Sequence, residues 1–363
     1  MPMIGRRGFM QTTGLAAVGL AAARCRASAS AARGRPKIKV GQIGTGHAHA
    51  SGKMSTFRKL AEDYEVVGVV EPDPGLRRAA EKQAAYRGLR WMTEEQLLAM
   101  PSLKAVAVET EVKDLVPTAA RCVQAGMHVH LDKPAGQSLS AFRKLLDAAA
   151  RRRLVVQMGY MFRNNPAFEL CFRAIREGWL GRVFELDAVI SKMYAPQARK
   201  PLEAYPGGLM FELGCHLIDA AVIALGKPRR VIPIIQRTRP EEDQVADNTL
   251  AVLEYPEAIA TVRSAALEVD GTWRRQFLVG GDRGTIQIRP LEPPRVELVL
   301  AEAQGNFRKG IQEVRLPAMP GRYDGQLAEL ARIIRGEEEN KYPPVHDLAV
   351  HETILRASNL PVD

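Results

Sequence analysis

The chain has 363 residues, of which 51 are Lys or Arg and 41 are Asp or Glu, and its formal net charge is +10. Six arginines and no acidic residue lie within residues 1–35, so the 45 basic and 41 acidic residues of the remainder carry only +4. This balance argues against a nucleic-acid-binding protein, which concentrates positive charge on its folded domain. The four cysteines form no CxxC pair, so no disulfide framework is implied.

Residues 1–32 show the parts of a twin-arginine signal peptide in the expected order. Arg6 and Arg7 precede an apolar stretch over 14–23, and small residues follow at 27–32. The apolar stretch is about half of the ~20 residues that span a bilayer. We therefore predict export by the twin-arginine translocase and a periplasmic or otherwise exported protein. A disordered basic tail is the alternative.

The remaining ~330 residues predict two domains, over 36–157 and 158–363. In the first, short apolar runs alternate with amphipathic stretches, which is typical of a parallel sheet of βαβ units. Thr93 and Gln96 form a capping box that begins a short helix. The expected strands are 38–43, 65–70, 103–108, 128–131 and 154–158, and the longer helices are 115–125 and 140–152.

A glycine-rich turn follows the first expected strand. It reads Gly44-Thr45-Gly46-His47-Ala48-His49, where glycines permit a tight turn and the close approach of a pyrophosphate. His49 stands at the third position of this fingerprint, where Gly or Ala is usual. Glu71 ends the next strand, at the spacing of an acid that binds a ribose 2′-hydroxyl. We predict that Gly44, Thr45, Gly46, His47 and Glu71 bind NAD, with NADP possible; a solvated strand end is the alternative for Glu71.

The strand over 128–131 ends in Asp132-Lys133-Pro134. This segment resembles the Gfo/Idh/MocA family of oxidoreductases, in which the strand ends in Glu-Lys-Pro. The resemblance implies a Rossmann domain followed by an α/β domain with a largely antiparallel open sheet. It places Lys133 in the active site, beside the nicotinamide and the substrate hydroxyl.

Two later segments strengthen the resemblance. One is the crossover Gly159-Tyr160 to Pro166, in which Tyr160 and Arg163 are candidates for lining the cleft and Asn165 can cap a helix. The other runs from Gly207 to Asp219 and resembles the family's glycine-rich turn and helix with acid-x-x-x-His.

Glu212 and His216 stand four residues apart on that expected helix and so share one face. The carboxylate can then orient the imidazole, and we predict His216 as general base with Glu212 as its support. Asp219 falls near the same face and is a candidate for binding substrate.

No metal site is predicted. His47, His49, His128 and His130 lie in or near the predicted cleft. The chain has neither a helical His-x-x-x-His nor a Cys/His set, and the resembling family uses no catalytic metal.

After the predicted Glu212 helix, the pattern changes to successive β-like runs joined by short turns, which predicts an antiparallel sheet. The expected strands are 230–236, 249–255, 258–265, 275–279 and 285–288, and helices are expected over 325–336 and from about residue 348. By resemblance, the open face of this sheet makes a homo-oligomer.

The sequence thus predicts an exported NAD(P)-dependent oxidoreductase that acts on a CH–OH group of a sugar, sugar acid or cyclitol. Two alternatives stay open: an NAD-dependent glycoside hydrolase that oxidises transiently, and a non-catalytic binding protein that retains the nucleotide.

Overall fold

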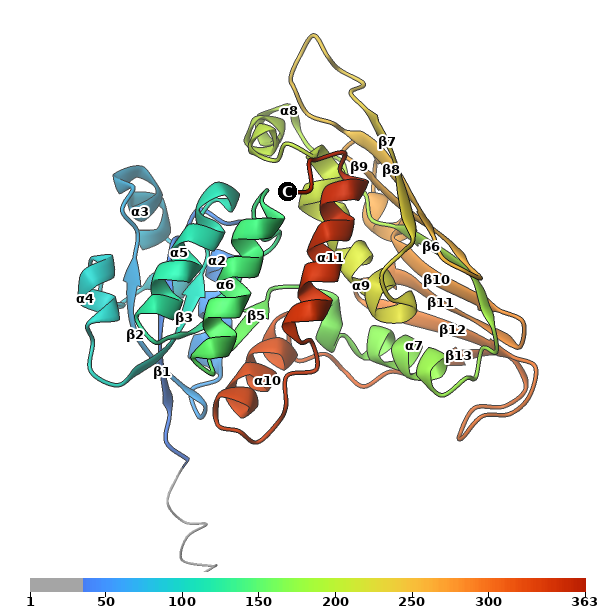
Figure 1. Ribbon diagram of the computed structural model, residues 1–363, viewed down its shortest axis with the longest axis horizontal. Helices are drawn as coiled ribbons and strands as arrows, with labels where there is room; N and C mark the ends of the chain where they lie inside the picture. The colour runs from blue at the N-terminus through green and yellow to red at the C-terminus, as the bar shows by residue number, and fades with distance from the viewer. Residues whose placement is uncertain (1–34) are drawn as a thin grey trace, which may run out of the picture. The chain divides into compact units, whose positions relative to one another are not determined.

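The computed structural model describes residues 35–363, and the predicted signal peptide lies outside the described residues. Residues Ile38–Asp363 form one unit that contains two sheets (Figure 1). No helix within 35–363 is long and apolar enough to cross a membrane.

The first sheet is parallel and confirms the predicted Rossmann architecture. Strands β1 and β3 are neighbours although β2 comes between them along the chain, so the connections cross over and place ligand-binding loops at the carboxyl edge. Its strand order is β2 (Tyr64–Val70), β1 (Ile38–Ile43), β3 (Leu103–Val108), β4 (His128–Leu131) and β5 (Val156–Met158).

Strand β5 begins two residues later than predicted. Arg153 has a φ of +56°, and the Leu154 N–H donates to the Ala149 carbonyl at 2.9 Å. This left-handed turn ends the preceding helix, so Leu154 belongs to the helix terminus rather than to the strand.

Helices fill the gaps between these strands. The predicted capping box is confirmed: the Gln96 N–H donates to Thr93 Oγ1 at 3.3 Å, and the Thr93 N–H donates to Gln96 Oε1 at 3.0 Å. Helix α5 begins at Val112, three residues earlier than predicted. Asp114 lies in its first turn, where a negative charge is favourable. The helices are α2 (Ala50–Lys59), α3 (Pro74–Glu81), α4 (Glu94–Leu98), α5 (Val112–Gln124) and α6 (Leu139–Arg151).

The second sheet has eight strands, and all neighbouring pairs are antiparallel except β6 with β9. This confirms the largely antiparallel sheet. Its order is β13 (Gly310–Val314), β12 (Pro294–Leu300), β11 (Gly284–Leu291), β10 (Gln276–Gly281), β6 (Val183–Val189), β9 (Ile259–Ala265), β8 (Asn248–Glu254) and β7 (Arg230–Gln236).

Three of these strands, β6, β12 and β13, were not predicted. Strand β12 begins at Pro294 directly after Pro293, and prolines argue against a strand when only the sequence is read. Strand β6 precedes the other seven along the chain yet lies between β10 and β9 in the sheet. The position of β6 in the sheet therefore depends on strands β9 and β10, which are far away in the sequence.

Three helices, α7 (Pro166–Arg176), α9 (Cys215–Leu225) and α11 (Pro344–Ala357), cover one face of this sheet (Figure 1). Helix α11 begins four residues before the predicted start, because Pro344 fits the first helical position. Helix α10 (Asp324–Ile334) returns to the first sheet, where Leu327 packs in one cluster with Val40 and Ala105. The last part of the chain therefore ties the two sheets together.

Candidate active site

The glycine turn lies at the carboxyl end of β1 and passes close to the end of β3. Gly44 has a φ of +90°, and a Cβ there would lie 2.6 Å from the Thr110 backbone nitrogen. A Cβ on Gly46 would come within 3.1 Å of Leu76. Position 44 therefore needs glycine both for its backbone conformation and for its contact with the end of β3.

Glu71, at the end of β2, contacts this turn. Its Oε2 accepts hydrogen bonds from the Thr45 N–H at 2.7 Å and from Thr45 Oγ1 at 2.8 Å. A cavity of about 610 Å³ opens beside it, with Trp91 and Arg77 in its lining. A carboxylate, a glycine turn and a nucleoside-sized cavity on one sheet edge fit a bound dinucleotide.

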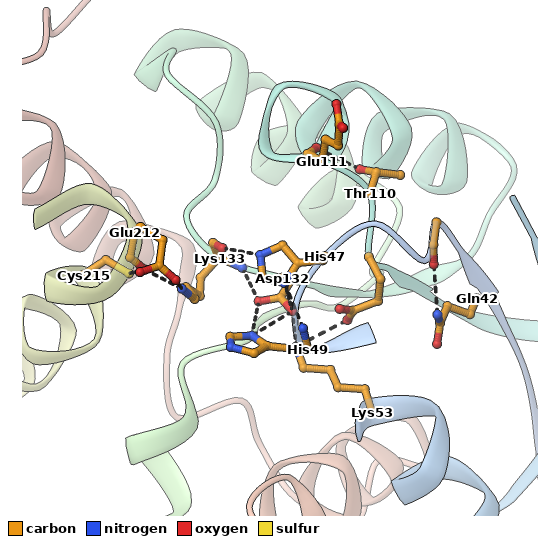
Figure 2. A network of polar contacts seen from close by, with 12 residues as sticks. Gln42, His47, His49, Lys53, Thr110, Glu111, Asp132, Lys133, Glu212 and Cys215 are labelled. Atoms are coloured by element: carbon orange, nitrogen blue, oxygen red, sulfur yellow. Dashed lines mark hydrogen bonds and ion pairs between the residues drawn. The ribbon is translucent and has the colours of Figure 1, made fainter. Parts of the chain in front are cut away.

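A buried polar cluster lies at the carboxyl end of β4, with Asp132 at its centre (Figure 2). Asp132 Oδ2 is 3.0 Å from His47 Nδ1, 3.2 Å from His49 Nδ1 and 3.0 Å from Lys53 Nζ. Lys53 Nζ is also 3.3 Å from Glu109 Oε1. The cluster thus joins the β1–α2 turn to the ends of β3 and β4.

Charge and burial set the ionisation of this cluster. Burial alone would raise the pKa of Asp132, but His47, Lys53 and His49 outweigh it and hold that pKa well below its usual range. Burial, and then the charge of Asp132, raise the pKa of Glu109 well above its usual range. No sequence motif pointed to Lys53 or Glu109. The spacing of His49 and Lys53, four residues apart at the start of a helix, was the available signal.

Lys133 extends from the end of β4 toward the second domain. Its Nζ donates to the Glu212 carbonyl at 2.5 Å and lies 3.8 Å from Glu212 Oε1 (Figure 2). Burial alone lowers the pKa of Lys133, but Cys215 and Glu212 raise it by more, so its net shift is upward. The side chain therefore remains an ammonium and can donate hydrogen bonds.

The predicted support of His216 by Glu212 is wrong. Residues Met210–Gly214 form a π-helical turn directly before α9, and Glu212 lies in this turn. The Glu212 carboxylate accepts instead from the Tyr194 hydroxyl at 3.1 Å and faces Lys133. Within residues 35–363, His216 Nδ1 has no hydrogen-bond partner.

His216 is nevertheless close to the cluster. Its ring centroid is 6.1 Å from those of His49 and Tyr160 and 5.8 Å from that of Phe162. Burial, and then the charge of Lys133, lower the pKa of His216 well below its usual range. The imidazole is therefore neutral at physiological pH.

Arg163 and Asp219 are bound to each other rather than open to a substrate. Both are buried; Arg163 Nη2 donates to Asp219 Oδ1 at 2.7 Å and to Asp347 Oδ1 at 2.6 Å. The guanidinium also lies 5.0 Å from the Tyr160 ring and 4.1 Å from the Tyr342 ring. We therefore revise the substrate-binding prediction for Arg163 and Asp219, which hold the crossover against α9 and α11.

Comparisons with known proteins define the class. A family model described as an oxidoreductase family with an NAD-binding Rossmann fold matches residues 38–160, and a model of the GFO/IDH/MocA C-terminal domain matches residues 168–287. The chain is thus an NAD-binding oxidoreductase. The two models together match more than half of its residues, and it belongs to the Gfo/Idh/MocA family.

Individual relatives agree with this assignment. The chain is 26% identical over 275 residues to the uncharacterized oxidoreductase YdgJ of Escherichia coli (strain K12), covering 70% of this chain and 78% of that protein. It is 29% identical over 145 residues to inositol 2-dehydrogenase 1 of Saccharopolyspora erythraea, covering 40% and 43%. A solved structure of levoglucosan dehydrogenase in complex with NADH and levoglucosan matches with a TM-score of 0.73 and 18% identity, over 89% of this chain and 98% of that one. That likeness supports the fold.

Proposed function

We propose that the protein is an NAD-dependent dehydrogenase of a sugar, sugar acid or cyclitol hydroxyl. The observation that carries this proposal is the meeting of two groups from different domains: the Lys133 ammonium at the end of β4 and the Glu212 turn before α9. Relatives named inositol 2-dehydrogenase and levoglucosan dehydrogenase act on substrates of this class by their names.

The protonation states of Lys133 and His216 assign them different roles in the reaction. Lys133 stays protonated, so it positions the substrate oxygen by hydrogen bonding. His216 is neutral and is the better acceptor for the hydroxyl proton. Glu212 keeps Lys133 in place rather than supporting the imidazole. When bound, NAD accepts or returns the hydride.

The position of Glu71 favours NAD over NADP as the cofactor. Its carboxylate lies at the end of β2 beside the cavity, where a 2′-phosphate would meet negative charge. We infer that Gly44, Thr45, Gly46 and His47 bind the pyrophosphate, and Thr45 is held in place by Glu71.

Export and assembly are further parts of the proposal. The twin-arginine pattern over 1–32 supports export of the folded protein with its nucleotide already bound. Ile234, Ile259 and Ile311 are exposed on strands β7, β9 and β13, which supports a homo-oligomer through the second sheet.

The test is to denature purified protein, identify the released nucleotide, and follow nicotinamide absorbance while sugars, cyclitols and glycosides are added. We expect NAD and net redox with at least one polyol. Loss of turnover in His216→Gln with nucleotide still bound would support its role as base. Glycoside cleavage without net redox would select the glycoside hydrolase. Absence of any nucleotide binding would refute both the dehydrogenase and the hydrolase.

A further inference from the structure

Three groups that commonly bind metal ions meet at the end of β4. One ligand atom from each of His47, His49 and Asp132 lies within 4.8 Å of the others. Figure 2 shows both imidazoles directed at the Asp132 carboxylate. Two histidines and one carboxylate are a recurrent ligand set for divalent transition metals, with further positions left open.

The backbone fixes the tautomer of His47. Its Nε2 is 3.1 Å from the Lys133 carbonyl oxygen, which can only accept, so Nε2 carries a hydrogen. In a neutral ring, Nδ1 then carries a lone pair, and the His49 backbone N–H donates to it at 3.4 Å. Metal-binding histidines commonly donate their second ring N–H to a backbone carbonyl in this way.

That lone pair faces another acceptor. His47 Nδ1 is 3.0 Å from Asp132 Oδ2, and both atoms are buried away from water. Two lone pairs at this distance repel each other unless a cation or a proton lies between them. His49 Nδ1 lies 3.2 Å from each of the two Asp132 oxygens and converges on the same place.

Lys53 is the competing cation, since its Nζ is 3.0 Å from Asp132 Oδ2. It also contacts a second carboxyl group, because Glu109 Oε1 lies at 3.3 Å. Apart from this contact, neither carboxyl oxygen of Glu109 has a hydrogen-bond partner within residues 35–363. Lys53 can therefore keep its contact with Glu109 while Asp132 binds a metal ion.

We propose that His47, His49 and Asp132 bind one divalent transition-metal ion of the kind that accepts two imidazoles and a carboxylate. The ion fixes the strand end from which Lys133 extends, because the Lys133 N–H donates to Asp132 Oδ1 at 2.6 Å. The site goes beyond the proposed hydride transfer, which needs no metal. Its ligands come from two separate segments and include no helical His-x-x-x-His, so no local sequence motif marks the site.

The test is a titration of the chelator-treated, full-length protein with Co²⁺, whose visible absorption reports its coordination. Bound metal is also counted after desalting. We expect one ion per chain, displaced by Zn²⁺. His49→Gln should weaken binding by at least the roughly 10- to 100-fold known for losses of outer-shell groups. His128→Gln is the matched control, because His128 lies at the other end of β4 and should leave binding unchanged.

The decisive measurement is made on the wild-type protein, so the result does not depend on whether a variant folds. Substoichiometric uptake of Co²⁺ by the wild type, or equal affinity in folded His49→Gln, would overturn the proposal and leave a proton between His47 and Asp132. NAD binding is measured in the same samples without substrate. Failure of the metal site is thereby distinguished from failure of the dehydrogenase proposal.

Discussion

His351 on α11 should make the protein less stable in acid. The side chain is 1% exposed, and its ring packs edge-on against Phe142 with 5.2 Å between centroids. Neither ring nitrogen finds a hydrogen-bond partner within residues 35–363. Burial lowers the pKa of His351 to about 4, and the charge of Asp363 opposes this only in part.

The direction of the effect follows from proton binding. The folded-state pKa lies below the ordinary value of 6.5, so the unfolded chain binds more protons between those two pH values. The stability associated with neutral His351 is complete above pH 6.5 and falls as the pH drops toward 4. A shift of about 2.5 units corresponds to roughly 3 kcal/mol in total, of which about 2 kcal/mol is lost by pH 5.

Urea unfolding at pH 7.5 and pH 5 measures this contribution. Between these two conditions the free energy of unfolding should fall by about 2 kcal/mol more in wild type than in His351→Leu. His351→Gln is the control, because it keeps a buried polar group but cannot titrate, and it should show the same reduced pH dependence. An equal loss in wild type and both variants would show that His351 does not cause the loss of stability in acid.

Three further predictions concern cofactor choice, folding and assembly. Glu71→Ser should shift the ratio of kcat/KM for NAD over that for NADP toward NADP, because a 2′-phosphate no longer meets a carboxylate; an unchanged ratio would remove Glu71 from cofactor selection. Arg163→Met should lower the free energy of unfolding in urea by roughly 3–5 kcal/mol, since it leaves Asp219 and Asp347 buried without their cation. Ile259→Lys should reduce the mass measured by light scattering, and an unchanged mass would exclude this face from the oligomer contact.

The parts of the site that depend on neighbouring residues could be predicted from the sequence. The Gly44 turn follows from local backbone chemistry, and Glu71 from its distance along the chain. Lys133 was placed at the end of β4 because a strand and a proline flank it. The structure places each of these residues at the carboxyl edge of the first sheet.

The parts that depend on distant contacts could not be predicted. Glu212 and His216 looked paired because they are four residues apart, but the Glu212 carboxylate contacts Tyr194 and Lys133 instead. Lys53 looked like an ordinary helix residue, since nothing nearby in sequence shows that Glu109 and Asp132 surround it. Asp219 was predicted to bind substrate, but in the folded protein it forms an ion pair with Arg163.

We propose that Lys133 acts in NAD-dependent oxidation of a polyol hydroxyl. The most direct measurement compares single-turnover reduction of NAD by wild type and Lys133→Met, with the substrate found in the polyol panel. NAD binding is followed separately by fluorescence. We predict that the rate of hydride transfer falls by roughly 10²- to 10³-fold, as for loss of a group that stabilises the reacting oxygen, with NAD affinity little changed. An unchanged rate in Lys133→Met would exclude Lys133 from the reaction.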